Sequence, residues 1–195
     1  MKPEDQLLRL FVAVDLPEDV REALHRLQSD LRQQELSGLR WVRPEGVHLT
    51  LKFLGETPAE RVPAIEGALA TALLGTEPFR LALGEPGTFG GRRGPRVVWL
   101  DITGDVQRLR GLQAAVERAM VGVGFAPEER QYSPHLTLAR VPQPPRPGTA
   151  ERDSRALEAV EPPRVEFEVR EIVLIRSRLQ PGGAEYERLA GFPLA

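Results

Sequence analysis

Hydrophobic residues recur along the chain with two periods, one typical of strands and one typical of helices. Residues 10–16 and 97–102 are runs rich in β-branched and aromatic residues, which predicts two strands. Each run is followed by apolar residues spaced three and four apart, which predicts a helix with one buried stripe. The stripes consist of Val20, Leu24, Leu27 and Leu31 in the first helix and of Val106, Leu109, Leu112, Val116, Met120 and Val123 in the second. The same spacing at Val62, Ile65, Leu69 and Leu73 predicts a third helix within residues 59–74.

Aligning the chain with itself shows that one unit occurs twice. Residues 14–20 match residues 100–106 at an offset of 86 positions, and the strand-like residues 79–83 fall opposite 165–169 at the same offset. One tetrapeptide also recurs, at an offset of 87, as His48-Leu49-Thr50-Leu51 and His135-Leu136-Thr137-Leu138.

The order of these elements predicts an α+β fold. Two pseudo-symmetric lobes, each an antiparallel sheet with helices packed outside it, are expected around a central cleft. We predict one bilobal domain over residues 1–195, with repeats of approximately 1–94 and 95–180 and a last strand at 185–189.

Two segments depart from the regular pattern. Residues 84–95 are rich in glycine and include Arg92 and Arg93, which predicts a flexible connection or lid between the repeats. In the second copy, the segment after the histidine motif is interrupted by Pro142, Pro144, Pro145 and Pro147. We therefore expect a loop there, with a short helix around residues 151–160.

Composition is that of an ordinary soluble globular protein, with 41% hydrophobic and 28% charged residues. No apolar run approaches the roughly 18 residues that cross a bilayer, and the first residues lack the order of a signal peptide. We expect a cytoplasmic monomer that contacts no membrane. The absence of cysteine excludes disulfides, a thiolate nucleophile and cysteine-based metal sites. A net charge of −2 argues against a general nucleic-acid coat but not against a local basic groove.

The paired histidine motifs are the candidates for chemistry. Side chains alternate along a strand, so His48, Thr50 and Lys52 are expected on one face, as are His135 and Thr137 in the second motif. If the repeats face one another, two His-Thr pairs converge. One imidazole can then remove a proton while the other donates one, because the usual histidine pKa of about 6.5 lies near neutrality. With hydroxyls to bind phosphate oxygens, this set suits in-line attack on phosphorus without a separate nucleophile.

Other interpretations of the histidines are weaker. A lone strand histidine is more often a packed or surface residue than a catalyst, but duplication of a structural strand does not by itself explain two identical His-Thr faces. His25 lies on the polar side of a predicted helix, so we expect it to be solvated.

Neither motif has a carboxylate or a second histidine on the same face within the next two alternating positions, so we predict no metal and no cofactor. Neither a Gly-x-Ser-x-Gly elbow nor a Walker-type phosphate loop occurs.

The chain resembles the 2H phosphoesterase superfamily, named for two His-x-Thr/Ser-x motifs, and within it the RNA 2′,3′-cyclic phosphodiesterases also called 2′-5′ RNA ligases. Besides the two motifs, the resemblance rests on residues 9–17, residues 53–56, Ser133-Pro134, residues 175–177 and Tyr186. It implies metal-independent hydrolysis of RNA 2′,3′-cyclic phosphate ends to 2′-phosphomonoesters. A reversible, ATP-independent 2′-5′ joining of RNA is implied as a related activity.

The same resemblance implies roles for individual residues. His48 would donate a proton to the departing 3′ oxygen, and His135 would accept one from water. Thr50 and Thr137 would bind the phosphate. Arg140 matches the family's arginine after the second motif. Simple alternation places Arg140 on the apolar face of its strand, so contact with RNA requires a twist, a bulge or a strand end.

Four more residues are candidate RNA contacts. Phe11 and Tyr132 are possible stacking platforms for a base, although Phe11 also suits core packing. Lys52 and Arg130 lie near the motifs and can meet the RNA backbone. Two alternative functions stay open: a phosphodiesterase acting on small cyclic nucleotides or ADP-ribose cyclic phosphate, and a non-catalytic module that binds a nucleotide or RNA.

Overall fold

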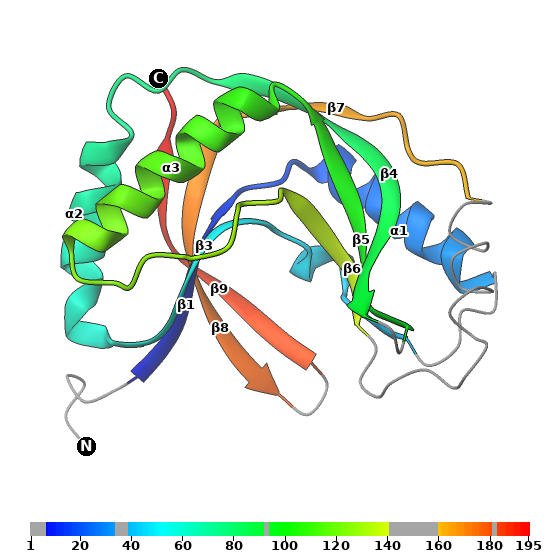
Figure 1. Cartoon of the computed structure of the whole chain (residues 1–195), viewed down its shortest axis with the longest axis horizontal. Helices are drawn as coiled ribbons and strands as arrows, with labels where there is room; N and C mark the ends of the chain where they lie inside the picture. The colour runs from blue at the N-terminus through cyan, green and yellow to red at the C-terminus, as the bar shows by residue number, and fades with distance from the viewer. Residues whose placement is uncertain (1–6, 34–38, 92–93, 141–159, 181–182) are drawn as a thin grey trace.

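The computed structural model describes residues 7–33, 39–91, 94–140, 160–180 and 183–195 (Figure 1). The strands are β1 (Leu7–Val14), β2 (Arg40–Trp41), β3 (Leu49–Pro58), β4 (Phe79–Gly91), β5 (Gly94–Gly104), β6 (His135–Arg140), β7 (Glu166–Val169), β8 (Glu171–Gln180) and β9 (Gly183–Pro193). The helices are α1 (Glu18–Gln33), α2 (Val62–Ala72) and α3 (Val106–Gly122), with 3₁₀ turns η2 (Pro44–Gly46) and η3 (Ala59–Arg61). No described helix is long and apolar enough to cross a membrane.

The strands pair antiparallel and form one curled sheet in the order β7-β4-β5-β6-β3-β1-β8-β9, with β2 beside β6 (Figure 1). From the centre outward, the order is β3, β1, β8 and β9 in one half and β6, β5, β4 and β7 in the other. The halves meet at a single ladder pair, Leu49 with Leu136. The predicted α+β class with two pseudo-symmetric antiparallel halves is confirmed, and the two sheets are continuous through this pair.

The ladder registers repeat between the halves. β1 and β3 contain the pairs Val14–Leu49, Ala13–Thr50 and Phe11–Phe53, and β5 and β6 contain Leu100–Leu136, Trp99–Thr137 and Val97–Arg140. Corresponding residues in the two sets are separated by 86 or 87 positions, as in the sequence repeat. The repeat therefore extends to the pairing of individual residues around both histidine motifs.

Three predicted segments have different outcomes. The described part of residues 84–95 belongs to the β4–β5 hairpin, so the prediction of a flexible connection or lid is wrong. Glycine serves close packing there, because a Cβ on Gly87 would lie 2.4 Å from Cζ2 of Trp99. The predicted last strand at 185–189 lies within β9 and is confirmed. The helix predicted around 151–160 lies outside the described residues, apart from its last position.

The two faces of the sheet are buried differently. Leu10 and Val12 of β1 belong to the main core, which also contains the apolar stripes of the helices. Phe11 and Ala13 alternate with them and form a second, small cluster with two residues of β8 on the opposite face. The ring of Phe11 contacts His48, so this second face is the one that carries the first histidine.

The long helices cross between the halves of the sheet. α1 follows β1 but lies toward β6, whereas α3 follows β5 but lies beside β3 and α2 (Figure 1). Gln28 of α1 donates from Nε2 to the carbonyl oxygen of Leu138, at 3.1 Å. Gln113 of α3 donates from Nε2 to the carbonyl oxygen of Leu51, at 3.4 Å. The acceptors are equivalent residues of the two repeats, so each glutamine binds the helix of one half to the histidine strand of the other.

Leu51 and Leu138, whose carbonyls accept these glutamine bonds, are the extra residues of two β-bulges. Neither has a partner on the adjoining β1 or β5, while the residues on both sides of it are paired. A bulge adds one residue to a strand and inverts the alternation of side chains beyond it. Beyond the bulges, the residues turned into the core are Lys52 and Ala139, and the residues turned outward are Phe53 and Arg140.

Lys52 anchors β3 to α3. Its side chain is 4% exposed, and Nζ donates to Oε1 and Oε2 of Glu117 at 2.7 and 2.8 Å and to the Ala126 carbonyl at 3.0 Å. Glu117 Oε1 also accepts the backbone N–H of Glu128 at 2.9 Å, on the segment that leads to β6. A buried ammonium needs such partners because its desolvation is costly. The predicted RNA contact at Lys52 is therefore wrong: the bulge turns this side chain into the core.

Replacing Lys52 with methionine preserves the length of the side chain but leaves the Glu117 carboxylate without its cation. We expect the free energy of unfolding to fall by about 3 kcal/mol, because a largely buried carboxylate loses its charge partner. Urea denaturation measures this change. The control is Arg26→Met, which removes an exposed pair with Glu22 and is expected to change stability by less than about 0.5 kcal/mol. Equal stability of the two variants would contradict an anchoring role for Lys52.

Candidate active site

The two histidine motifs meet at the junction between the halves. Leu49 pairs with Leu136, and both side chains are fully buried. In an antiparallel ladder the adjacent positions run in opposite directions, so His48 lies across from Thr137, while Thr50 lies across from His135. All four of these side chains are half-buried and alternate with the buried leucines. The pairing therefore brings the two predicted His-Thr pairs together crosswise on one face.

Both imidazoles are held in the same tautomer by a backbone carbonyl two residues earlier. Nδ1 of His48 lies 2.9 Å from the carbonyl oxygen of Gly46, and Nδ1 of His135 lies 2.8 Å from that of Ser133. A carbonyl oxygen only accepts hydrogen bonds, so each Nδ1 must carry the proton. Each Nε2 is then the nitrogen that can accept a proton from a substrate or return one.

Aromatic rings enclose each histidine edge to face. The ring of His48 lies 4.7 Å from Tyr186 of β9 and 5.4 Å from Phe11 of β1, measured between centroids. The ring of His135 lies 4.9 Å from Phe89 of β4 and 6.5 Å from Trp99 of β5. These aromatic residues do not occupy equivalent positions of the repeat. The two histidines therefore have similar anchors but different surroundings.

Burial lowers the pKa of His48 from its usual 6.5 to about 4. Desolvation of the charged imidazolium is the largest cause, and the positive charge of Arg21 acts in the same direction. The hydrogen bond to Gly46 and the negative charge of Asp15 oppose the shift. In the free protein His48 is thus neutral at pH 7, with an unprotonated Nε2.

The turn that supplies the carbonyl of Gly46 is tied to α1 by Arg21. The guanidinium donates from Nε to the Leu16 carbonyl at 3.1 Å, from Nη1 to the Glu45 carbonyl at 3.3 Å and from Nη2 to Asp15 Oδ1 at 3.2 Å. One side chain therefore joins the end of β1, the start of α1 and η2. These bonds fix the segment from which the His48 ring is oriented.

The aromatic candidates from the sequence serve packing. Phe11 is 4% exposed and contacts His48 with its ring, so the prediction that it stacks on a base is wrong. Tyr132 packs against the main core and donates from its hydroxyl to the carbonyl oxygen of Thr50 at 3.2 Å. Burial raises the pKa of this phenol, which keeps it protonated as a donor. Tyr132 therefore supports the strand of Thr50 from the segment that precedes His135.

The cationic candidates separate into three cases. Lys52 is buried, as described above. Arg130 is exposed on the segment before β6, where its backbone N–H donates to Glu128, and its contact with RNA stays a prediction. Arg140 is exposed, and the bulge at Leu138 returns it to the face of Thr137. The bulge that the sequence required for Arg140 is therefore present.

Sequence reasoning missed several residues around the histidines. Phe53 is 65% exposed and lies 5.8 Å from Phe11, but simple alternation placed it on the core side. Phe89 stood in a glycine-rich segment interpreted as a lid. Tyr186 entered only through the family resemblance, although its ring contacts His48. The aromatic type of these residues was visible, whereas their proximity depends on strand pairing over long sequence separations.

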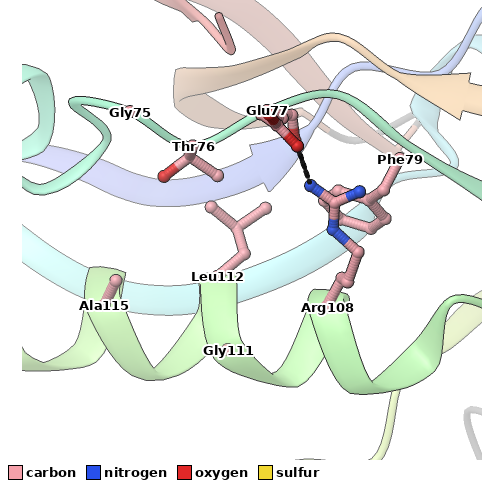
Figure 2. Close-up of a pocket in the computed structure, with 8 residues that line it drawn as sticks. All are labelled: Gly75, Thr76, Glu77, Phe79, Arg108, Gly111, Leu112 and Ala115. Carbon is pink, nitrogen blue, oxygen red and sulfur yellow. Dashed lines mark hydrogen bonds and ion pairs between the residues drawn. The ribbon is translucent and has the colours of Figure 1, made fainter.

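A separate pocket of about 310 Å³ lies on the helical side of the molecule, between α3 and the turn that leads to β4 (Figure 2). Arg108 of α3 points toward Glu77 of that turn, with Nη2 3.4 Å from Oε2, and its guanidinium lies over the ring of Phe79. The pocket contains no histidine. Among the described residues, no three His, Cys, Asp or Glu side chains gather as a metal site.

Comparison with known proteins agrees with this arrangement. A family model for LigT-like phosphoesterases matches the chain twice, over residues 14–99 and 100–186. The chain is 36% identical to an RNA 2′,3′-cyclic phosphodiesterase of Methanothermobacter thermautotrophicus, over 96% of this chain and 99% of that protein. It is 34% identical to an RNA 2′,3′-cyclic phosphodiesterase of Geobacillus stearothermophilus over 94% of this chain, which spans 56% of that longer relative. The crystal structure of E. coli LigT complexed with 3′-AMP has a TM-score of 0.76 at 28% identity, covering 97% of this chain and 99% of that one.

The two matches to the family model divide the chain between its repeats. One contains the motif of His48 and the other contains the motif of His135. The identities extend over nearly the whole chain and exceed 30% for both relatives. The family expected from the paired motifs is confirmed: the chain belongs to the LigT-like phosphoesterases of the 2H phosphoesterase superfamily.

Proposed function

We propose that the protein hydrolyses RNA 2′,3′-cyclic phosphate ends to 2′-phosphomonoesters without a metal. The observation that carries the proposal is the crosswise arrangement of two His-Thr pairs on one face, each histidine with its Nδ1 anchored and its Nε2 available. Further support comes from the relatives that are named RNA 2′,3′-cyclic phosphodiesterases. A strained cyclic diester suits such a site because water can attack phosphorus directly.

The proposed reaction is one in-line displacement. Nε2 of His135 takes a proton from water as the water oxygen bonds to phosphorus, and the bond from phosphorus to the 3′ oxygen breaks. Nε2 of His48 protonates that departing oxygen, so the phosphate stays on the 2′ oxygen. The hydroxyls of Thr50 and Thr137 donate to the non-bridging oxygens, where negative charge must be stabilised. The product is a 2′-phosphomonoester beside a free 3′-hydroxyl.

The burial of His48 adds a condition to this assignment. A proton donor must be charged before it acts, yet burial keeps the pKa of His48 at about 4 in the free protein. An anionic phosphate beside Nε2 favours the imidazolium and raises that pKa. Substrate binding therefore supplies the charge that prepares His48 as the acid, while His135 acts as the base.

The same site accounts for a related joining reaction. When the 5′-hydroxyl of a second RNA replaces water, the same two proton transfers form a 2′-5′ phosphodiester and release the 3′ oxygen. No nucleotide triphosphate is consumed, because one diester bond replaces another. Adding a 5′-hydroxyl RNA to the assay below measures this joining beside hydrolysis.

An RNA oligonucleotide that ends in a 2′,3′-cyclic phosphate, incubated with the protein in EDTA, tests the proposed function. We expect conversion to the 2′-phosphomonoester, identified by chromatography against the 2′ and 3′ standards. His48→Ala and His135→Ala are each expected to lower kcat by about 10²- to 10⁴-fold, because each removes one proton-transfer group. The control is His25→Ala, which changes an exposed histidine on α1 and is expected to retain full activity. Loss of activity in EDTA, a 3′-phosphate product, or full activity of either motif variant would overturn the proposal.

The protonation of His48 is measurable by itself. In a ¹⁵N NMR titration of the free protein, we expect the imidazole of His48 to titrate near pH 4, because burial disfavours its charged form. The folded protein then binds fewer protons than the unfolded chain between about pH 4 and 6.5, so this residue lowers stability as the pH falls through that window. Adding a nucleoside 2′-monophosphate should shift the midpoint upward. A midpoint near 6.5 in the free protein, assigned with His48→Gln, would contradict the effect of burial.

A further inference from the structure

Three arginines from separate segments, Arg9, Arg43 and Arg140, lie near Tyr186 and the first histidine, and Arg40 pairs with Arg140. Tyr186 is 38% exposed, and its ring is 4.7 Å from that of His48. A Cβ on Gly46 would lie 3.0 Å from Cε2 of Tyr186, so the ring rests on the turn that orients His48. Side chains around Tyr186 are therefore next to the reacting groups.

Arg9 and Arg43 each lie close to Tyr186. Arg9 of β1 pairs with Ser177 of β8, and Ser177 pairs with Tyr186 of β9, which places these side chains in one row on one face. The small serine leaves the two longer side chains as neighbours across it. Arg43 donates from Nη2 to the carbonyl oxygen of Ala184 at 3.4 Å, two residues before Tyr186.

Arg140 and Arg40 extend the positive surface toward β6. The two residues pair directly in the β2–β6 ladder, and both are exposed. Like charges directly opposite one another destabilise a sheet, so this pair carries a cost in the absence of an anion. The bulge at Leu138 turns Arg140 to the face of Thr137.

The positive charges of three of these arginines act on the hydroxyl of Tyr186. Burial raises the pKa of the Tyr186 phenol, and the positive charges of Arg140, Arg9 and Arg43 oppose that rise. Many other described arginines form ion pairs with carboxylates: Arg21, Arg26, Arg108, Arg164, Arg170, Arg176, Arg178 and Arg188. Within the part of the chain that the structure describes, Arg9, Arg40, Arg43 and Arg140 form no such pair.

We propose that Arg9, Arg40, Arg43 and Arg140, the arginine cluster, bind the phosphates of the RNA chain on the 5′ side of the reacting nucleotide. This inference rests on the proposed function and deepens it. Four guanidiniums spread over β1, β2, the residue before η2 and β6 suit a chain of phosphates better than one anion. The site therefore favours an oligonucleotide end over a 2′,3′-cyclic mononucleotide, which lacks those phosphates.

The inference is tested by comparing two substrates, uridine 2′,3′-cyclic phosphate and an RNA tetranucleotide ending in the same group. We expect the ratio of kcat/KM for the tetranucleotide to kcat/KM for the mononucleotide to fall about tenfold in Arg9→Gln/Arg43→Gln, because two guanidiniums no longer neutralise phosphates. The dependence of log kcat/KM for the tetranucleotide on log salt should become shallower by about 0.7 for each phosphate that the variant leaves without its arginine. The control is Arg118→Gln, which removes one exposed charge on α3, on the helical side of the sheet, and so matches the single variant Arg9→Gln in charge.

A binding measurement separates failure of this inference from failure of the proposed function. Fluorescence anisotropy with a 3′-phosphorylated RNA tetranucleotide needs no catalysis, and we expect the double variant to bind about tenfold more weakly than Arg118→Gln. Arg9→Gln alone keeps every side-chain hydrogen bond described for the cluster, so a partial loss of affinity in this variant excludes misfolding as the cause. Equal binding and an equal substrate ratio in the variants and the control would overturn the proposal that the arginine cluster binds RNA phosphates. Normal RNA binding by a wild-type protein that hydrolyses neither substrate would overturn the proposed function and leave the cluster supported.

Discussion

The β-bulges at Leu51 and Leu138 decide which side chains stand beside the two histidines. Without them, strict alternation would place Phe53 and Arg140 in the core and would leave Lys52 outside. The carbonyl oxygen at each bulge accepts a hydrogen bond from a glutamine in the helix of the other half, and the carbonyl of Leu138 also accepts the backbone N–H of Val42. The crossing of α1 and α3 between the halves is thus tied to the surface of the site. Removal of either bulge would change both the packing of a helix and the face of a histidine strand.

The pseudo-symmetry explains why the two histidines are anchored in the same way, but it does not extend to the residues around them. Both rings are fixed by the carbonyl two residues earlier, because the two motifs adopt the same local backbone. In the proposed mechanism, the acid and the base must nevertheless differ in protonation. The surroundings of the two rings do differ, because Tyr186 of β9 lies beside His48 and Phe89 of β4 lies beside His135. Duplication therefore explains two similarly anchored imidazoles, whereas the aromatic residues around each of them differ.

The sequence was most informative where structure depends on local periodicity. The helical stripes, the repeat offset and the His-Thr alternation all follow from spacing within one segment, and the structure has the corresponding elements. The misplacement of Lys52 has a different origin, because a bulge is defined by the pairing of two strands and leaves no local signal in β3. Phe89 illustrates a second limit: glycines that make room for Trp99 resemble those of a loop until the partner strand is known. For Arg140 the sequence did predict an irregularity, because simple alternation would have placed this charged side chain on the apolar face of its strand. The bulge in β6 is that irregularity.

The burial of His48 also bears on the kind of ligand that can activate the site. An uncharged molecule at Nε2 would add to desolvation and leave the imidazole neutral, with no proton to donate. A phosphodiester brings negative charge into surroundings of low polarity, where its attraction for a proton on His48 is stronger than it would be in water. The same burial that lowers the pKa in the free protein therefore increases the response to an anion. In the proposed mechanism, proton donation by His48 then depends on correct placement of phosphate between the two strands, which couples recognition of the charged group to the chemical step.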